Sequence, residues 1–228
     1  MVLPKPSDDY MTPLTSSFTL ETASTALVLI DLQYASACRT EGLGRRMIEA
    51  GTEHITKWRF DRVEQMVLPN VKKLLAFFRE HNLKVLYVTV GSMMADYSDA
   101  LPHMRELLQS ANNHEGTREH EILDEVKPIP GEYVLNKTTI GAFSSTGIDN
   151  LLRSWGAKYL LFAGVSTNMC VDGTAREAVD RGYCGILVED ALGAAKEEYH
   201  QAAIVNWQRL YGRVNSTEEV IGELRQRL

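Results

Sequence analysis

The sequence predicts an α/β fold with three layers, in which a mostly parallel, six-stranded sheet carries helices on both faces. Short apolar runs typical of buried strands recur along the chain, and amphipathic segments with helical spacing lie between them. Alternation of this kind produces parallel sheets. The chain has 228 residues, of which 44% are hydrophobic, so it can bury a sizeable core. We therefore expect one domain over residues 1–228, with residues 1–24 as an N-terminal extension.

The first half of the chain predicts three strands and one long helix. Apolar runs at residues 26–30, 85–90 and 133–136 are the strands. Between the first two, apolar side chains mark one helix face: Val63, Met66, Val67, Val71, Leu74, Leu75 and Phe78. Two polar stretches, 34–62 and 91–130, are predicted to be long loops that set specificity, because long loops in compact domains are usually lids or binding loops.

The second half continues the same alternation. A short helix around Leu151, Leu152 and Trp155 precedes a strand at residues 159–163. A helix then begins near Cys170, and it is followed by a strand at 184–188, a helix at 202–210, an edge strand at 212–214 and a helix at 217–228 capped by Ser216. In this order the elements predict a Rossmann-like sheet.

The stretch 164–178 is the most informative part of the sequence. An apolar run stops at Gly164, the N-cap types Ser166, Thr167 and Asn168 follow, and apolar residues then recur with helical spacing. Cys170 therefore lies in or just before the first turn of a helix, where the helix dipole and free N–H groups favour the reactive thiolate. The alternative is a buried cysteine that acts only as a small apolar side chain.

Two charged residues also stand at the ends of predicted strands. Asp31 follows the strand at 26–30, and Lys137 follows the strand at 133–136. Taken singly, Asp31 could cap a turn and Lys137 could be solvated. Carboxyl ends of parallel strands share one edge of the sheet, so an acid, an amine and the thiol of Cys170 could meet in one crevice there.

Three segments together point to a family: residues 27–33, residues 136–137 with 141–143, and residues 164–171 with 174–178. They resemble the isochorismatase-like cysteine hydrolases, which include nicotinamidase, N-carbamoylsarcosine amidase, ureidoacrylate amidohydrolase, and biuret and triuret hydrolases. The resemblance implies a catalytic triad of Asp31, Lys137 and Cys170. It also implies a cis peptide bond between Val165 and Ser166 and an oxyanion hole formed by the backbone N–H groups of Ser166 and Cys170.

The chemistry of such a triad is consistent with amide hydrolysis. An ionised cysteine is a strong nucleophile, Asp31 can take the thiol proton and return it to a leaving amine, and Lys137 can orient the carboxylate and stabilise the thiolate. Two backbone donors can stabilise the tetrahedral oxyanion. Water would then hydrolyse the thioester.

Substrate contacts are expected from residues near these motifs and in the two long loops: Gln33, Tyr34, Phe143, Val165, Asn168, Arg39 and Arg105. Many relatives have Asn-Asp-Phe after the Asp-x-Gln, where this chain has Tyr34-Ala35-Ser36. Tyr34 and Phe143 are therefore candidates for the aromatic wall of the pocket, with packing in the core as the alternative. An arginine could clamp a substrate carboxylate through two hydrogen bonds, but for any single arginine a surface charge is the favoured interpretation.

We expect no metal and no other cofactor. Nicotinamidase-type relatives bind a metal through an Asp-x-His pair and a further His, and the stretch 91–99 has no such pair. Asp96, His103 and His114 lack the spacing. The remaining histidines are expected at the surface: His54, His81, His120 and His200.

Composition excludes several classes of function. The net charge is −6 without a long basic run, which argues against nucleic acid as a partner. No apolar run approaches the ~18 residues that a membrane span needs. Three cysteines without paired spacing and an N-terminus without a signal pattern indicate a reducing, cytoplasmic location. We also expect a homo-oligomer, either a dimer or a tetramer.

We therefore predict a metal-independent cysteine amidohydrolase that cleaves a C–N bond of a small linear amide, carbamoyl or ureido substrate. Two alternatives remain. One is a nicotinamidase- or isochorismatase-type hydrolase, and the other is a catalytically silent scaffold of the same fold. Stoichiometric labelling of Cys170 by iodoacetamide at neutral pH would separate the enzyme from the scaffold.

Overall fold

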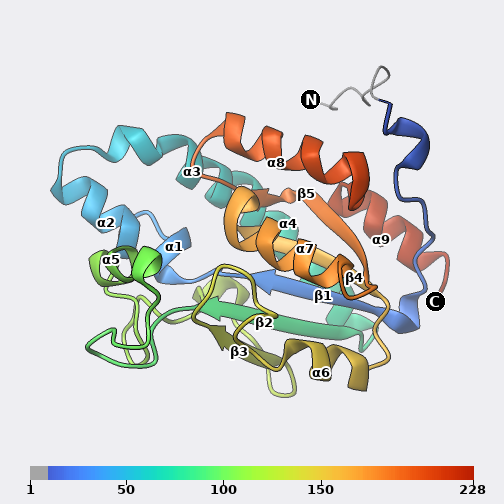
Figure 1. Cartoon of the computed structure of the whole chain (residues 1–228), viewed down its shortest axis with the longest axis horizontal. Helices are drawn as coiled ribbons and strands as arrows, with labels where there is room; N and C mark the ends of the chain where they lie inside the picture. The colour runs from blue at the N-terminus through green and yellow to red at the C-terminus, as the bar shows by residue number, and fades with distance from the viewer. Residues whose placement is uncertain (1–9) are drawn as a thin grey trace.

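Parallel strands form the central layer of the computed structural model, which describes residues 10–228 (Figure 1). Within these residues the sheet has six strands in the order β3-β2-β1-β4-β5-β6. Their bounds are β1 Thr25–Ile30, β2 Lys84–Val90, β3 Tyr133–Lys137, β4 Tyr159–Val165, β5 Cys184–Gly193 and β6 Gly212–Asn215. Every neighbouring pair is parallel. The order reverses between β1 and β4, and ligands of such sheets bind outside the carboxyl ends of the strands at that point.

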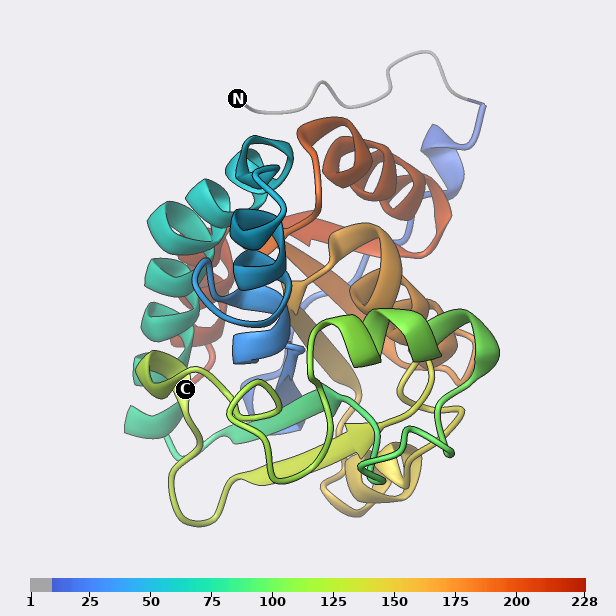
Figure 2. The same cartoon turned by 90° about the vertical axis from the view of Figure 1, so that its left-hand side faces the viewer.

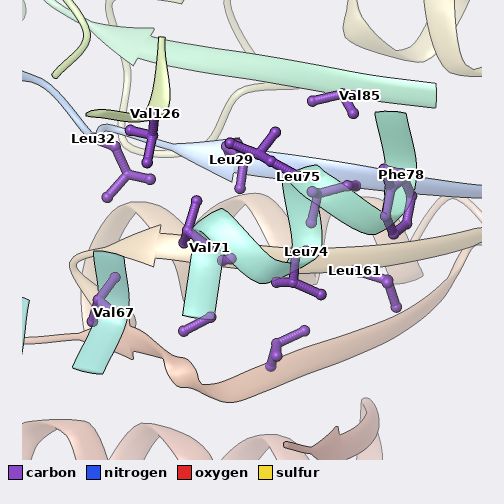
Figure 3. Close-up of a cluster of buried hydrophobic side chains, with 14 of the residues drawn as sticks. Leu29, Leu32, Val67, Val71, Leu74, Leu75, Phe78, Val85, Val126 and Leu161 are labelled. Carbon is purple, nitrogen blue, oxygen red and sulfur yellow. The ribbon is translucent and has the colours of Figure 1, made fainter. Parts of the chain in front are cut away.

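Helices cover both faces of the sheet, as predicted. On one face, α4 (Leu68–Glu80) and α9 (Thr217–Arg225) pack on side chains such as Leu29 and Leu161 (Figure 3). On the other face, the helices α6 (Ile148–Ser154), α7 (Asp172–Val179) and α8 (Glu197–Leu210) pack on the alternate side chains of the same strands. The prediction of a three-layer α/β fold is confirmed.

The two long predicted loops contain helices, so that part of the prediction was wrong. The first holds α1 (Tyr34–Ala37), α2 (Gly42–Glu49), a 3₁₀ turn (Glu53–Thr56) and α3 (Lys57–Arg62). A π-helical turn, Val63–Val67, joins α3 to α4. The second holds α5 (Pro102–Ser110) and a 3₁₀ turn (Asp124–Val126). Figure 2 shows α2 and α5 in front of the sheet, on the side to which the arrows of β1 and β2 point in Figure 1.

Other boundaries differ from the prediction by a few residues. Strand β5 continues beyond residue 188 to Gly193, and α8 begins at Glu197 rather than at residue 202. The predicted cap of the last helix is present. The Ser216 hydroxyl accepts a hydrogen bond from the Glu219 backbone N–H, and the Glu219 carboxylate accepts one from the Ser216 backbone N–H. This reciprocal pair is a capping box.

The predicted N-terminal extension lies partly outside the described residues. Its described part contains two 3₁₀ turns, Thr12–Leu14 and Thr22–Ser24. The Leu20 backbone N–H donates to Glu223, and the Thr22 hydroxyl donates to the Leu224 carbonyl, so this segment is fastened to α9. The prediction of a single domain over the whole chain stays a prediction. In the part of the chain that the structure describes, no helix is long and apolar enough to cross a membrane.

Candidate active site

Asp31, Lys137 and Cys170 lie together at the carboxyl edge of the sheet. The Lys137 Nζ atom is 3.1 Å from Asp31 Oδ2 and 3.2 Å from Cys170 Sγ. The three residues are 2%, 0% and 7% exposed, respectively. An acid, an ammonium group and a thiol therefore share a site that is almost closed to bulk water.

Each of the three residues is positioned by the end of a strand. Asp31 directly follows β1 in the left-handed region, with φ of 52°, which aspartate tolerates better than most residues. Its backbone N–H still donates to the Val88 carbonyl, so its backbone remains tied to β2. Lys137 is the last residue of β3, and Cys170 lies in a π-helical turn, Thr167–Val171, directly before α7.

Gly164 allows the cysteine turn to approach Asp31. It has φ of 121° and lies opposite Ile30, the last residue of β1. A Cβ atom at this position would stand 2.0 Å from the Ile30 carbonyl oxygen. Only glycine fits so close an approach of two backbones. The peptide bond between Val165 and Ser166 is cis, as the resemblance implies.

Burial controls the protonation of the cysteine. It raises the pKa of the Cys170 thiol to about 12, Asp31 raises it as well, and Lys137 acts in the opposite direction. Removing the sulfur from water therefore opposes the thiolate, which the nearby N–H groups and the ammonium favour. The expectation of a reactive thiolate stays a prediction.

Asp31 and Lys137 lie at ion-pair distance. Burial raises the pKa of Asp31, and Lys137 opposes this rise. Burial lowers the pKa of Lys137, but Asp31 and Cys170 outweigh it and leave this pKa above its ordinary value. Asp31 Oδ2 accepts from Lys137, whereas Oδ1 is buried and has no hydrogen-bond partner in the described part of the chain. Oδ1 is thus the oxygen that is free to accept a proton.

Helix α7 holds the loop that follows Lys137. The Thr174 hydroxyl accepts a hydrogen bond from the Ala142 backbone N–H at 3.2 Å, and the Glu177 carboxylate accepts one from the Phe143 backbone N–H at 2.8 Å. The Ser144 hydroxyl donates to the same carboxylate. These contacts explain why the Cys170 motif continues through residues 174–178.

Arg59 of α3 also belongs to the site, and the sequence analysis did not find it. It is 4% exposed. Its Nε and Nη2 donate to the Ser36 carbonyl at 3.0 and 2.7 Å, and its Nη1 donates to the Ser166 hydroxyl at 2.7 Å. Burial lowers its pKa to about 10, against the attraction of Cys170 and Asp31. The sequence held only the weak signal of a charge beside the apolar Phe60 and Val63.

His200 is fully buried, so the expectation of a surface position was wrong. Its Nδ1 lies 2.8 Å from the Thr167 hydroxyl, in the turn that carries Cys170. Its Nε2 lies 2.9 Å from the Glu189 carboxylate and 3.0 Å from Arg62 Nη2. His200 lies on α8, and these polar groups give both of its ring nitrogens a hydrogen-bond partner. His120 is also partly buried, against Asn113.

Several candidate substrate contacts have other partners. Gln33 is fully buried, and its amide bonds to the Val90 N–H, the Val90 carbonyl and the His120 carbonyl. The Tyr34 hydroxyl bonds to Asp124 at 3.0 Å. We therefore assign Gln33 and Tyr34 to holding the segment after β1, because their polar atoms are occupied within the protein.

The predicted arginine clamps are occupied in the same way. Arg39 pairs with Asp61 at 2.7 Å and with Glu64 at 2.8 Å. Arg105 donates to the Ala100 carbonyl at 3.0 Å. These partners compete with a substrate carboxylate, so the structure does not support either arginine as its clamp.

The last three candidates differ in exposure. Val165 is buried in the core on the α4 side. Phe143 is 8% exposed and belongs to the same buried cluster as Cys170. Asn168 is exposed, two residues before Cys170. Asn168 is therefore the candidate nearest Cys170 along the chain, and Phe143 is the candidate that shares its buried cluster.

The side chains of Asp96 and His114, in the segment between β2 and β3, contact backbone groups. The Asp96 carboxylate accepts from the Ser98 backbone N–H at 3.0 Å, and His114 Nδ1 contacts the Glu115 carbonyl at 2.8 Å. Among residues 10–228, no group of three His, Cys, Asp or Glu side chains is placed to hold a metal ion.

The chain is similar to a known domain family and to several known proteins. Residues 25–219 match the model of the isochorismatase domain. Ureidoacrylate amidohydrolase RutB of Agrobacterium fabrum is 30% identical over 91% of this chain and 93% of its own length. The Enterobacter sp. enzyme of the same name is 32% identical over 85% of this chain and 86% of its own length. The crystal structure of a cysteine hydrolase from Pseudomonas syringae superimposes with a TM-score of 0.76 at 20% identity, over 94% of this chain and 98% of that one, which shows a shared fold.

Proposed function

Because this chain belongs to the isochorismatase domain family and is a hydrolase acting on C–N amide bonds, we propose that Cys170 is its nucleophile and that its substrate is a small linear amide, carbamoyl or ureido compound. One observation carries the proposal: Lys137 Nζ lies within hydrogen-bond distance of both Asp31 Oδ2 and Cys170 Sγ. Ordinary buried cysteines have apolar neighbours. A thiol beside a buried ion pair is typical of covalent catalysis.

In the proposed first half-reaction, Asp31 Oδ1 accepts the Cys170 proton while the sulfur attacks the carbonyl carbon of the substrate. Lys137 contacts both groups, so it holds them together while the negative charge moves from the carboxylate to the sulfur. The backbone N–H groups of Ser166 and Cys170 then donate to the oxyanion, and losing one such donor typically costs ~3–4 kcal/mol. Asp31 returns the proton to the leaving nitrogen, and the C–N bond breaks.

In the second half-reaction, water attacks the thioester carbonyl and Asp31 takes a proton from this water. The C–S bond breaks, and the sulfur regains a proton as the acid product leaves. The preference for a small substrate is supported by the 7% exposure of Cys170, which leaves little surface to approach. It is also supported by the ureidoacrylate amidohydrolases among the relatives. We keep the cytoplasmic location and the homo-oligomeric state as predictions.

The test is a screen of small carboxamides, N-carbamoyl and ureido compounds, with nicotinamide included, for release of ammonia or amine. We expect turnover of at least one linear compound and formation of a hydroxylamine-trappable acyl-enzyme. Cys170→Ala should lower kcat by at least ~10³-fold, as removal of a nucleophile commonly does. Cys184→Ala is the matched control, and it should retain activity because Cys184 lies at the other end of the sheet, at the start of β5.

Two results would contradict the proposal. Turnover of nicotinamide alone would favour the nicotinamidase alternative. Substantial hydrolysis by Cys170→Ala would exclude the covalent mechanism for whichever substrate is found.

A further inference from the structure

We propose that Arg59 is a positioning residue of this site: its guanidinium joins α3 to the turn that carries Cys170, and its buried positive charge favours transfer of the thiol proton from Cys170 to Asp31. This inference rests on the proposed function and deepens it. It concerns how the site produces a thiolate although burial raises the pKa of the Cys170 thiol.

The geometry of Arg59 connects the two sides of the site. On one side, two of its nitrogens bond to the Ser36 carbonyl, and the Ser36 hydroxyl in turn donates to the Asp31 carbonyl. On the other side, Nη1 bonds to the Ser166 hydroxyl. The Ser166 carbonyl accepts from the Met169 backbone N–H at 3.0 Å, inside the cysteine turn. A single planar guanidinium thus fixes the backbones that present both the base and the nucleophile.

The charge of Arg59 is also unusual in its surroundings. The side chain is buried, and its three hydrogen bonds all go to neutral oxygens rather than to a carboxylate. A buried cation without a local counter-ion interacts strongly with the nearest groups that can become anionic. In this protein those groups are Cys170 and Asp31. The charge therefore acts on the triad instead of being neutralised within α3.

The direction of this effect follows from where the negative charge sits. When the S–H bond breaks and an O–H bond forms on Asp31, one negative charge moves from the carboxylate to the sulfur. Lys137 lies 3.1 Å from the carboxylate oxygen and 3.2 Å from the sulfur, so it attracts the charge almost equally in both places. Arg59 adds a second positive charge, which is hydrogen bonded to Ser166 at the start of the cysteine turn and has no carboxylate partner of its own. We therefore assign to Arg59, rather than to Lys137, the stabilisation of the negative charge on the sulfur.

The experiment measures the reactivity of the thiol directly. The second-order rate of Cys170 alkylation by iodoacetamide is followed from pH 6 to pH 10 by intact mass, in a background with Cys38→Ser and Cys184→Ser. The variants are Arg59→Gln and Arg59→Lys. Arg213→Gln is the matched control, because Arg213 is also a partly buried arginine that binds a backbone carbonyl, but in β6 and paired with Glu223.

We expect Arg59→Gln to slow alkylation about tenfold at a given pH and to move the inflection of the rate upward by about one pH unit, since one unit of pKa is a tenfold change in thiolate. Arg59→Lys should keep the parent inflection because it keeps the charge. The pH profile of kcat/KM should shift in the same way, and Arg213→Gln should match the parent. Thermal melting by circular dichroism verifies that each variant is folded.

A folded Arg59→Gln variant with the parent pH profile would overturn the proposal, even if its kcat were lower, because that result leaves only a structural role. If Arg59→Gln does not fold, Arg59→Met takes its place: an inflection about one pH unit above the parent supports the charge argument, and the parent inflection refutes it. Alkylation needs no substrate, so this test is independent of the substrate screen. Hydrolysis by Cys170→Ala would refute the proposed function without depending on Arg59.

Discussion

The Nζ atom of Lys137 lies 3.1 Å from Oδ2 of Asp31, with both side chains at most 3% exposed. Removing one partner of a buried ion pair leaves the other charge unpaired, which typically costs ~3–5 kcal/mol. We expect Asp31→Asn and Lys137→Met each to lower the free energy of unfolding by about this amount. The double variant should recover much of the loss because neither charge of the pair remains, and it should stay inactive. Urea unfolding measures these energies.

The double variant is decisive for this first prediction. If its loss of stability equals the sum of the two single losses, the pair is not energetically coupled and the short distance has no consequence for stability. Activity in the double variant would independently exclude Asp31 as the base.

Gly164 is the position at which adding a single methyl group should lower the folding stability most. Gly164→Ala would place a Cβ atom 2.0 Å from the Ile30 carbonyl oxygen at a φ of 121°. We expect a loss of at least ~3 kcal/mol of folding free energy, since both the clash and the strained backbone contribute. Gly222→Ala in α9 is the matched control. Nothing lies within 4 Å of a Cβ there, so it should stabilise the helix by ~0.5–1 kcal/mol. A well-folded Gly164→Ala protein would contradict the close approach of β1 and β4.

Acid should destabilise the protein through His200. Burial lowers the pKa of His200 below its ordinary 6.5, and the polar groups that face it are Thr167, Arg62, Glu189 and Glu197. Below pH 6.5 the unfolded chain therefore takes up a proton that the folded chain does not. The free energy of unfolding should fall as the pH drops, by at most ~1.4 kcal/mol per pH unit for one proton. Melting curves between pH 7.5 and 5 measure this slope.

His200→Gln should reduce that slope, and the exposed His54→Gln should leave it as in the parent. An unchanged slope in His200→Gln would show that other groups bind the proton. Glu189 acts in a separate window. The hydrogen bond with His200 is the main cause that lowers the pKa of Glu189 to about 2, so its contribution is lost only as the pH falls from about 4.5 toward 2.

Chelation should not affect hydrolysis. The ligand spacing of metal-dependent relatives is absent from residues 91–99, and the side chains of Asp96 and His114 contact backbone groups instead. Dialysis against a strong chelator is expected to leave kcat and KM unchanged. Loss of activity that only zinc, iron or manganese restores would show that this loop holds a metal when substrate is present.

The sequence predicts the strands and the main helices because their burial is periodic. Helix α4 has an apolar stripe that includes Val71, Leu74 and Phe78, and α9 has its Ser216 cap. The segment before α4 has no such stripe. In α2 the residues that pack closely are Gly42 and Gly44, where an added Cβ atom would stand 2.4 Å from the Ala35 Cα atom and 2.1 Å from the Arg39 carbonyl oxygen. Packing through glycine leaves no periodic pattern of apolar residues in the sequence. The helices of this segment could therefore not be predicted.

The residues of the candidate site also fall into two groups, those that the sequence identifies and those that it does not. Asp31, Lys137 and Cys170 stand at strand ends within recognisable motifs, and the sequence therefore identifies them. Arg59 and His200 do not, because their partners Ser166 and Thr167 are 107 and 33 residues away along the chain. Nothing local distinguishes them from a surface arginine and a surface histidine. Burial against a distant turn is a property of the assembled sheet, which single-sequence patterns do not contain.

The three candidate catalytic groups lie far apart along the chain, so activity requires that the strands carrying them have assembled into the sheet. Asp31 and Lys137 are 106 residues apart, and Lys137 and Cys170 a further 33. Strand β1 must be flanked by β2 on one side and β4 on the other before the three can meet. A chain cut between β3 and β4 would carry the acid and the ammonium on one piece and the thiol on the other. Hydrolysis by such a split protein would return only on reassociation, so the enzyme could serve as its own complementation reporter.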